Sequence, residues 1–270
     1  MTRSIQSFKS LAFFLTLTFV LAGGLLNANS PDWITEKYPA YTLRYTLQEE
    51  NHKNEYLALI DEGIKSVESF FNSPFQKPFE IVIHPDRSSL DAAWQKQFNL
   101  PEFKSECWMV ASGDAFKLDM ISPMLWETES CEHHFTDMEK TQKLITHELV
   151  HVFHGQWNKS PDFSETSGMD WFVEGMAAYV SGQCDEGRMS QVRTALEQHK
   201  LPEELANFWT GQFKYGLSGS MIMYLDTIYG KQRLLDLLKI NCLKDLLAEL
   251  DTTESVILFG WTQFMNGHFH

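Results

Sequence analysis

One five-residue segment, His147-Glu148-Leu149-Val150-His151, constrains the fold of this chain more than any other feature. On a helix, residues four positions apart lie on the same face, so the two histidines can bind one metal ion while Glu148 lies beside them. Apolar residues around the segment supply the buried stripe that such a helix needs. They are Leu144, Ile145, Leu149, Val152 and Phe153.

The residues that flank this segment set the limits of the expected helix. Thr136-Asp137-Met138-Glu139 has the capping-box pattern that begins a helix, and Gly155 is typical of the residue that ends one. A helix over 137–154 is therefore predicted. The alternative is an ordinary amphipathic helix that carries two histidines by coincidence, and the motif alone leaves both open.

A catalytic zinc site needs three protein ligands and one open position, so a third ligand is expected further along the chain. A metzincin would have Gly at position 154 and His at 157, where this chain has His154 and Trp157. Glu174, in contrast, lies among apolar and small residues over 171–179. Burial of a carboxylate there is costly unless it is paired or bound to a metal. Glu174 is therefore the expected third ligand, and Gly175 would let its helix pack closely on the first.

Two stretches together resemble a known family. HELVH at 147–151 and WFVEGMAAY at 171–179 are similar to the gluzincin metallopeptidases, specifically the peptidase MA-like proteins related to the aminopeptidase N family. That family carries its glutamate ligand in an EGxAxY stretch and has a later catalytic tyrosine followed by a short pattern. The residues that match these features are Glu174-Gly175, Ala177, Tyr179, Tyr215, Tyr224-Leu225 and Gly230.

The resemblance implies a zincin-like fold and one Zn²⁺ per chain, held by His147, His151 and Glu174. It implies that Glu148 is the general base that activates a metal-bound water, and that Tyr215 stabilises the oxyanion of the transition state. The substrate would then be a peptide or a protein. Such a protein is a hydrolase, a secreted or periplasmic zinc metallopeptidase.

Some features of the family are missing. The chain has no GxMEN segment, whose glutamate holds the free amino terminus of a substrate, so endopeptidase action is favoured over aminopeptidase action. A narrower alternative is an exopeptidase that uses another acid for this purpose, for example Asp114 or Asp119. The alternative from a different class is a non-catalytic, zinc-binding envelope module that retains the peptidase fold.

Hydrophobic periodicity predicts an α+β fold. Residues 29–135 are expected to form a mixed α/β part with a small sheet, and residues 136–270 a mainly helical part that carries the metal site, together one domain over 29–270. The resemblance to gluzincins implies that the strand over 116–122 is an edge strand that aligns the substrate backbone. The other expected strands are 41–47 and 79–83, and the expected helices are 55–71, 89–98, 137–154, 170–182, 189–199, 217–229, 231–249 and 254–265.

The N-terminal residues have the layout of a secretory signal peptide. Arg3 and Lys9 form a basic start, an apolar stretch covers 11–26, and small residues at Ala28 and Ser30 follow it. A signal peptide over 1–28 and export to the periplasm or the extracellular space are predicted, with no stable membrane span in the mature form. The alternative is a membrane anchor formed by 11–26, although this stretch is short for a span.

The cysteines and the charge bear on compartment and partners. Four cysteines in the exported part permit two disulfides, and Cys107 and Cys131 are the favoured pair because they bracket one short segment. Cys131 with His133 and His134 is a weaker candidate for a second metal site. The 22 Lys and Arg residues against 36 Asp and Glu give a net charge of −14, which argues against a nucleic-acid partner.

Overall fold

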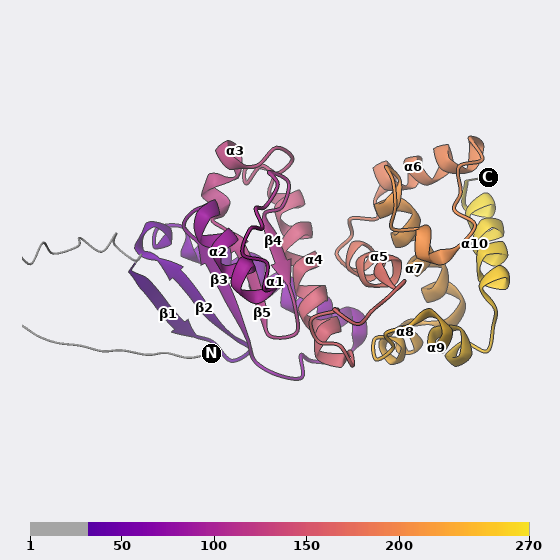
Figure 1. The fold of residues 1–270 in the computed structure, drawn as a ribbon, viewed down its shortest axis with the longest axis horizontal. Helices are drawn as coiled ribbons and strands as arrows, with labels where there is room; N and C mark the ends of the chain where they lie inside the picture. Colours follow the sequence, from indigo (N-terminus) through magenta and orange to yellow (C-terminus); the bar gives the residue numbers. More distant parts are fainter. Residues whose placement is uncertain (1–31, 270) are drawn as a thin grey trace, which may run out of the picture. The chain divides into compact units, whose positions relative to one another are not determined.

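A computed structural model describes residues 32–269 of the chain. The signal peptide predicted over 1–28 and the alternative anchor over 11–26 lie outside these residues. Residues 32–269 form one compact unit, in which every described strand precedes residue 138 and the described elements after that point are helices (Figure 1). The predicted α+β class is confirmed. Within the described residues, no helix combines the length and the apolar character needed to cross a membrane.

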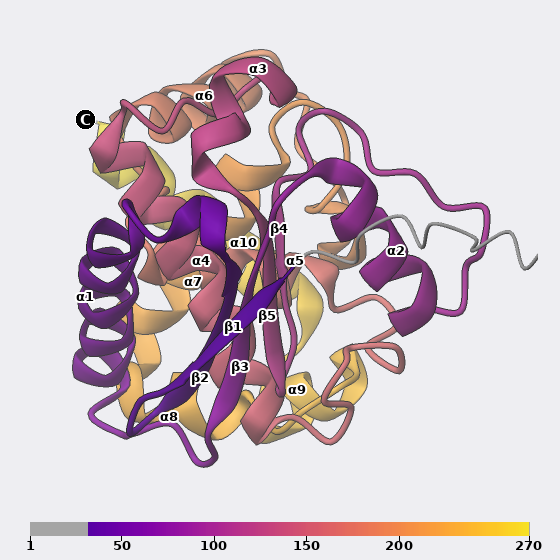
Figure 2. The same ribbon diagram turned by 90° about the vertical axis from the view of Figure 1, so that its left-hand side faces the viewer.

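The sheet of the N-terminal part has five strands in the order β1-β2-β3-β5-β4 (Figure 2). The three inner strands run parallel to one another, and each outer strand is antiparallel to its neighbour. The inner strands are buried nearly continuously, as expected for parallel strands covered on both faces. The strands are β1 (Trp33–Lys37), β2 (Tyr41–Thr46), β3 (Phe79–His84), β4 (Ala111–Gly113) and β5 (Lys117–Ile121).

The expectation that 116–122 is the edge strand is wrong. This segment forms β5, which lies between β3 and β4, and the edge strand on this side of the sheet is β4. The chain reverses between them because Asp114 Oδ1 accepts hydrogen bonds from the backbone N–H groups of Phe116 (2.8 Å) and Lys117 (2.9 Å). β4 has the sequence Ala-Ser-Gly, which is too short and too weakly apolar to show a strand pattern.

The two long helices of the N-terminal part pack on different elements. The amphipathic helix α1 (Lys53–Phe71) packs against α4 (Met138–Trp157), and α2 (Arg87–Gln97) packs against β3 and β5. The rings of Phe71 and Phe153 stack with centroids 4.7 Å apart and join the two parts of the chain in one hydrophobic core. α4 also packs directly against β4 and β5, which places it on the sheet.

Helices α5 to α10 lie on the other side of α4, from salmon to yellow in Figure 1. The helix expected over 231–249 is wrong, because the structure has two short helices there. The side-chain amide of Asn158 donates to the carbonyls of Leu238 (2.8 Å) and Ile240 (3.1 Å), which occupies carbonyls in the break between the two helices. The helices after residue 125 are α3 (Trp126–Glu129), α4, α5 (Asp170–Val180), α6 (Glu186–Glu197), α7 (Lys214–Tyr229), α8 (Lys231–Leu237), α9 (Leu243–Glu249) and α10 (Glu254–Phe269).

Candidate metal centre

Helix α4 begins and ends differently from the prediction. Its N-cap is Asp137, whose side chain accepts a hydrogen bond from the backbone N–H of Lys140 (3.2 Å), rather than Thr136. The helix also continues through Gly155 to Trp157. A Cβ at position 155 would lie 2.7 Å from both Ala115 N and Pro161 O, so this glycine allows two other segments to approach the helix.

The edge strand β4 lies directly on the turn of α4 that carries the two histidines. A Cβ at Gly113 would clash with the backbone carbonyl of Glu148 and would lie 3.2 Å from Cβ of His151. His147 and His151 are both buried, each 7% exposed. The two rings are held between the sheet edge and the helices that follow.

Helix α5 brings Glu174 to these histidines. Trp171 and Phe172, earlier on α5, are fully buried and anchor the helix. The side chain of Glu174 itself is only partly covered, and its Oε2 lies 3.3 Å from His147 Nε2 and 3.6 Å from His151 Nε2. The structure therefore brings the three residues together.

The distances within this group fit a metal site. The Nε2 atoms of His147 and His151 are 3.1 Å apart, so the three donor atoms form a triangle with edges of 3.1, 3.3 and 3.6 Å. Ligands about 2.0–2.1 Å from a tetrahedral zinc ion are about 3.3–3.4 Å from one another. Two nitrogens, one carboxylate oxygen and this spacing fit a metal ion. Among residues 32–269 this is the one cluster of three or more His, Cys, Asp or Glu side chains that could hold a metal ion.

The charges of the group are coupled. Burial raises the pKa of Glu174, but His151 and His147 lower it more, so its pKa lies well below the ordinary value and Glu174 is a carboxylate at neutral pH. Burial lowers the pKa of His151, and the charge and hydrogen bond of Glu174 more than reverse this. A proton and a metal ion therefore compete for the same imidazole.

A cavity of about 680 Å³ lies beside the group, and His147, Glu148 and Tyr215 all line it. Tyr215 is in the first turn of α7, where the ring of Trp209 meets its ring edge to face at 4.7 Å. Burial and the charge of Glu174 raise the pKa of Tyr215 to about 12, so its hydroxyl remains a hydrogen-bond donor at neutral pH. Glu148 and Tyr215 thus line the same cavity as His147, one of the three candidate metal ligands.

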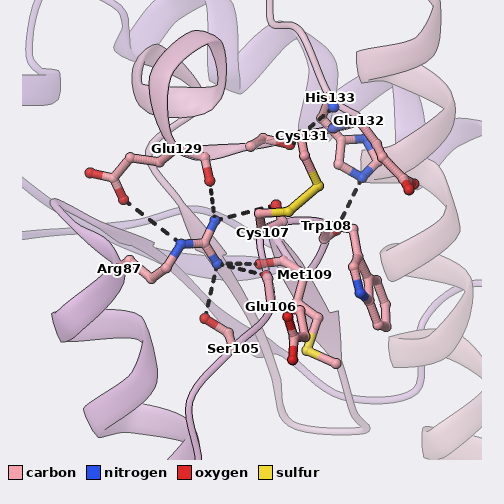
Figure 3. Close-up of a disulfide and its surroundings, with 11 residues drawn as sticks. Arg87, Ser105, Glu106, Cys107, Trp108, Met109, Glu129, Cys131, Glu132 and His133 are labelled. Carbon is pink, nitrogen blue, oxygen red and sulfur yellow. Dashed lines mark hydrogen bonds and ion pairs between the residues drawn. A yellow bond between two sulfur atoms is a disulfide. The ribbon is translucent and has the colours of Figure 1, made fainter.

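One wall of the cavity is built on a disulfide between Cys107 and Cys131 (Figure 3), the pair that the sequence favours. The segment after Cys107 contributes Trp108 and Met109 to the wall. The segment after Cys131 contributes Glu132 and His133.

Arg87, which no sequence pattern predicted as part of the site, holds the same two segments. Its guanidinium donates to Ser105 Oγ (2.9 Å) and to the carbonyls of Met109 (2.9 Å) and Glu129 (2.7 Å), as Figure 3 shows. No local pattern marks this arginine, because its partners lie 18 to 42 residues further along the chain.

The other histidines considered from the sequence have different partners. His133 Nε2 lies 3.2 Å from the carbonyl of Trp108, and His134 Nδ1 lies 2.9 Å from Glu127 Oε2. The sulfur of Cys131 is in the disulfide, so these three residues form no second metal site within the described part of the chain. His154 is fully buried, with its ring facing Phe163 and Phe172 at 5.1 and 5.7 Å.

Comparison with protein-family models and with curated proteins found no match. The fold and the site therefore identify a class of protein. It is an α+β protein with a possible metal site of two histidines and one glutamate beside a large cavity.

Proposed function

We propose that this chain is a zinc-dependent metallopeptidase that acts outside the cytoplasm. The observation that carries the proposal is the triangle of His147, His151 and Glu174 donor atoms, with edges of 3.1 to 3.6 Å, next to a cavity lined by a carboxylate and a tyrosine. A zinc ion bound there would lower the pKa of a coordinated water and polarise the scissile carbonyl.

Two residues of the chain would act on the substrate directly. Glu148 follows the ligand His147 and faces the cavity, where it would accept the proton of the attacking water and return it to the leaving amine. Tyr215 keeps its proton at neutral pH and would donate a hydrogen bond to the oxygen that becomes negative in the transition state. A metal site with a purely structural role needs neither group.

The substrate backbone would lie along β4. Ala111 and Ser112 of this strand line the cavity, and among the described strands β4 pairs only with β5. Its other edge can add an extended peptide as a further strand. β4 thus takes the role that the sequence assigned to 116–122.

Endopeptidase action is favoured because the two acids considered as amine anchors have other partners. Asp119 is buried and lies 2.8 Å from His84 Nε2 and 2.5 Å from Lys117 Nζ. Asp114 accepts the two backbone hydrogen bonds of the turn between β4 and β5. Neither is part of the cavity wall.

The disulfide supports the proposed location. Disulfides persist in oxidising compartments such as the periplasm and the extracellular space, and are rare in the cytosol. Cys107–Cys131 is therefore consistent with a signal peptide over 1–28 and a single exported domain over 29–270.

The test combines metal analysis with a cleavage assay. Bound zinc is measured by elemental analysis in the wild type, in Glu148→Gln and in the control Glu139→Gln. Glu139 is an exposed residue of α4 paired with Lys143 at 2.9 Å, outside the cavity wall. A quenched mixed-peptide library measures hydrolysis. We expect one zinc per chain in all three proteins, and cleavage in the wild type and Glu139→Gln but not in Glu148→Gln.

Two results would contradict the proposal. Zinc without cleavage in any of the three proteins would favour a non-catalytic zinc-binding envelope module. The absence of zinc from the wild type would show that the three donor residues do not form a zinc site.

A further inference from the structure

Arg188 is a cation in the cavity wall whose guanidinium has no acidic partner among the described residues. It lies in the first turn of α6, is partly buried, and donates from Nη1 to the neutral side-chain oxygen of Gln191 at 3.2 Å. No carboxylate oxygen of residues 32–269 lies within 4.0 Å of it. Its remaining donors are therefore free of charged partners.

The two lysines of the cavity wall are different. Lys140 pairs with Asp137 at 2.8 Å, and Lys143 pairs with Glu139 at 2.9 Å. The nearest acids in sequence are Glu186, which is exposed and forms no ion pair with Arg188, and Asp185, whose carboxylate accepts hydrogen bonds from the backbone N–H groups that begin α6. Asp137 and Glu139 thus pair with the two lysines and Asp185 caps α6, so the guanidinium of Arg188 remains available to bind a ligand.

Arg188 is held close to the proposed chemistry. Its guanidinium carbon lies 4.6 Å from the centroid of the Tyr215 ring. The backbones are also in close contact, because a Cβ at Gly216 would lie 2.7 Å from the carbonyl oxygen of Arg188. α6 and the start of α7 are thereby locked together, and a group bound by Arg188 would lie next to Tyr215.

The planar guanidinium presents paired N–H donors that match the two oxygens of a carboxylate, and such charge-assisted pairs are the strong ones. We propose that Arg188 binds a carboxylate of the peptide substrate, either the C-terminal carboxylate or an Asp or Glu side chain close to the scissile bond. This inference rests on the proposed function, and it assigns a preference for anionic peptides to an otherwise acidic protein.

A different role for Arg188 would be to hold Tyr215 alone, through its contact with the ring. The two roles predict different kinetics. A residue that acts only through Tyr215 would change kcat for every peptide alike, whereas a carboxylate anchor changes KM and affinity for anionic peptides and leaves neutral ones unaffected.

The test uses matched peptides: one with a free C-terminus and its C-terminal amide, and one with Glu and its Gln counterpart beside the cleaved bond. Binding is measured by calorimetry to Glu148→Gln protein, which needs no turnover, with Arg188 intact or changed to Gln or Lys. Arg193→Gln is the matched control, since Arg193 is an exposed residue of α6 outside the cavity wall. KM and kcat are measured in parallel with Glu148 restored.

We expect Arg188→Gln to weaken binding of the anionic peptides by about tenfold or more, to leave the neutral peptides within about twofold, and to raise KM correspondingly. Arg188→Lys keeps the positive charge but loses the paired N–H donors, so it should retain part of the affinity for the anionic peptides. It also replaces Arg188→Gln as the test variant if that protein does not fold. A loss on amidation alone identifies the C-terminal carboxylate, and a loss on Glu-to-Gln exchange alone identifies a side chain.

The proposal is overturned if protein with Arg188 intact binds anionic and neutral peptides equally, binds neither, or if Arg188→Gln weakens both kinds alike. Failure of the proposed function looks different. Arg188-dependent binding of anionic peptides without any cleavage by the wild type would retain the anchor and reject the peptidase.

Discussion

The Cα atom of Gly175 lies against the backbone carbonyl of Ser218. A Cβ at position 175 would be 2.6 Å from that oxygen and 2.8 Å from its carbon. This contact sets the separation of α5, which carries Glu174, from α7, which carries Tyr215. Because Gly175 has no side chain, α5 and α7 can approach closely. This approach determines whether Glu174 and Tyr215, the proposed metal ligand and oxyanion donor, reach the same site.

The first prediction concerns this contact. Gly175→Ala should destabilise the fold by about 1–3 kcal/mol because backbone atoms must move apart. It should also weaken zinc binding, since Glu174 moves with α5. Thermal unfolding and competitive zinc titration measure the two effects. The control is Gly267→Ala in α10, where a Cβ would meet nothing within 4 Å, and which should be neutral or slightly stabilising. Equal effects of the two substitutions would contradict the packing argument.

The second prediction concerns metal removal. A metal ion that binds the folded state alone adds about 2.7 kcal/mol to its stability at a concentration 100 times Kd. A chelator should therefore lower the melting temperature of the wild type, and should leave that of Glu174→Gln unchanged. Zinc affinity should fall with decreasing pH because the raised pKa of His151 favours the proton. An identical response of both proteins to the chelator would show that Glu174 is not a ligand.

The third prediction separates transition-state stabilisation from binding. Tyr215→Phe should lower kcat by about 100-fold with little change in KM, because the hydroxyl acts where charge develops. Since the pKa of Tyr215 is about 12, the hydroxyl should contribute no limb to the pH–rate profile between pH 6 and 9. An increase in KM at constant kcat would instead make Tyr215 a binding residue.

The fourth prediction concerns the two connections that hold the cavity wall. Cys107→Ser with Cys131→Ser should cost about 3 kcal/mol of stability, given the sequence separation of 24 residues. Cleavage should persist, because Arg87 still binds the same two segments. Combining Arg87→Met with the two serine substitutions should raise KM by more than the combined effect expected from the two changes measured separately. Simple additivity of the effects on KM would show that the two connections are independent.

The fifth prediction is a pH effect on stability. Burial lowers the pKa of His154 from its ordinary value of 6.5 to about 3. The unfolded chain gains a proton on this residue as the pH falls through 6.5, whereas the folded chain does not until about pH 3. The free energy of unfolding should therefore decrease over this range, by an amount on the order of several kcal/mol. His154→Leu should remove that component, as measured by urea unfolding with chelator present. An unchanged pH dependence in the variant would contradict it.

Local patterns predict much of the molecule. The positions of α1, α2 and α4, the three inner strands and the α+β class follow from the spacing of apolar residues. The spacing of His147 and His151 places two donors on one helix face, a property of any α-helix. Glu174 stands out because a lone carboxylate in an apolar helix needs a partner. These inferences require no knowledge of how distant segments meet.

Other features depend on contacts between residues far apart in the chain. The edge strand β4 exists because Ala111–Gly113 pairs with β5 and because Gly113 fits against α4. The helix expected over 231–249 is divided where Asn158, some 80 residues earlier, occupies carbonyl groups. Arg87 reaches partners up to 42 residues away, and Arg188 lacks an acidic partner within the described residues only because of where α6 packs.

The sequence by itself thus determined the helix periodicities, the donor residues and the division into a strand-containing and a helical part, because these depend on neighbours within a few residues. Tertiary packing decided which strand borders the cavity, which cations remain free in its wall and how closely α5 approaches α7. The physical reason is that hydrogen bonds, ion pairs and backbone contacts depend on distance in space, which local sequence patterns do not specify.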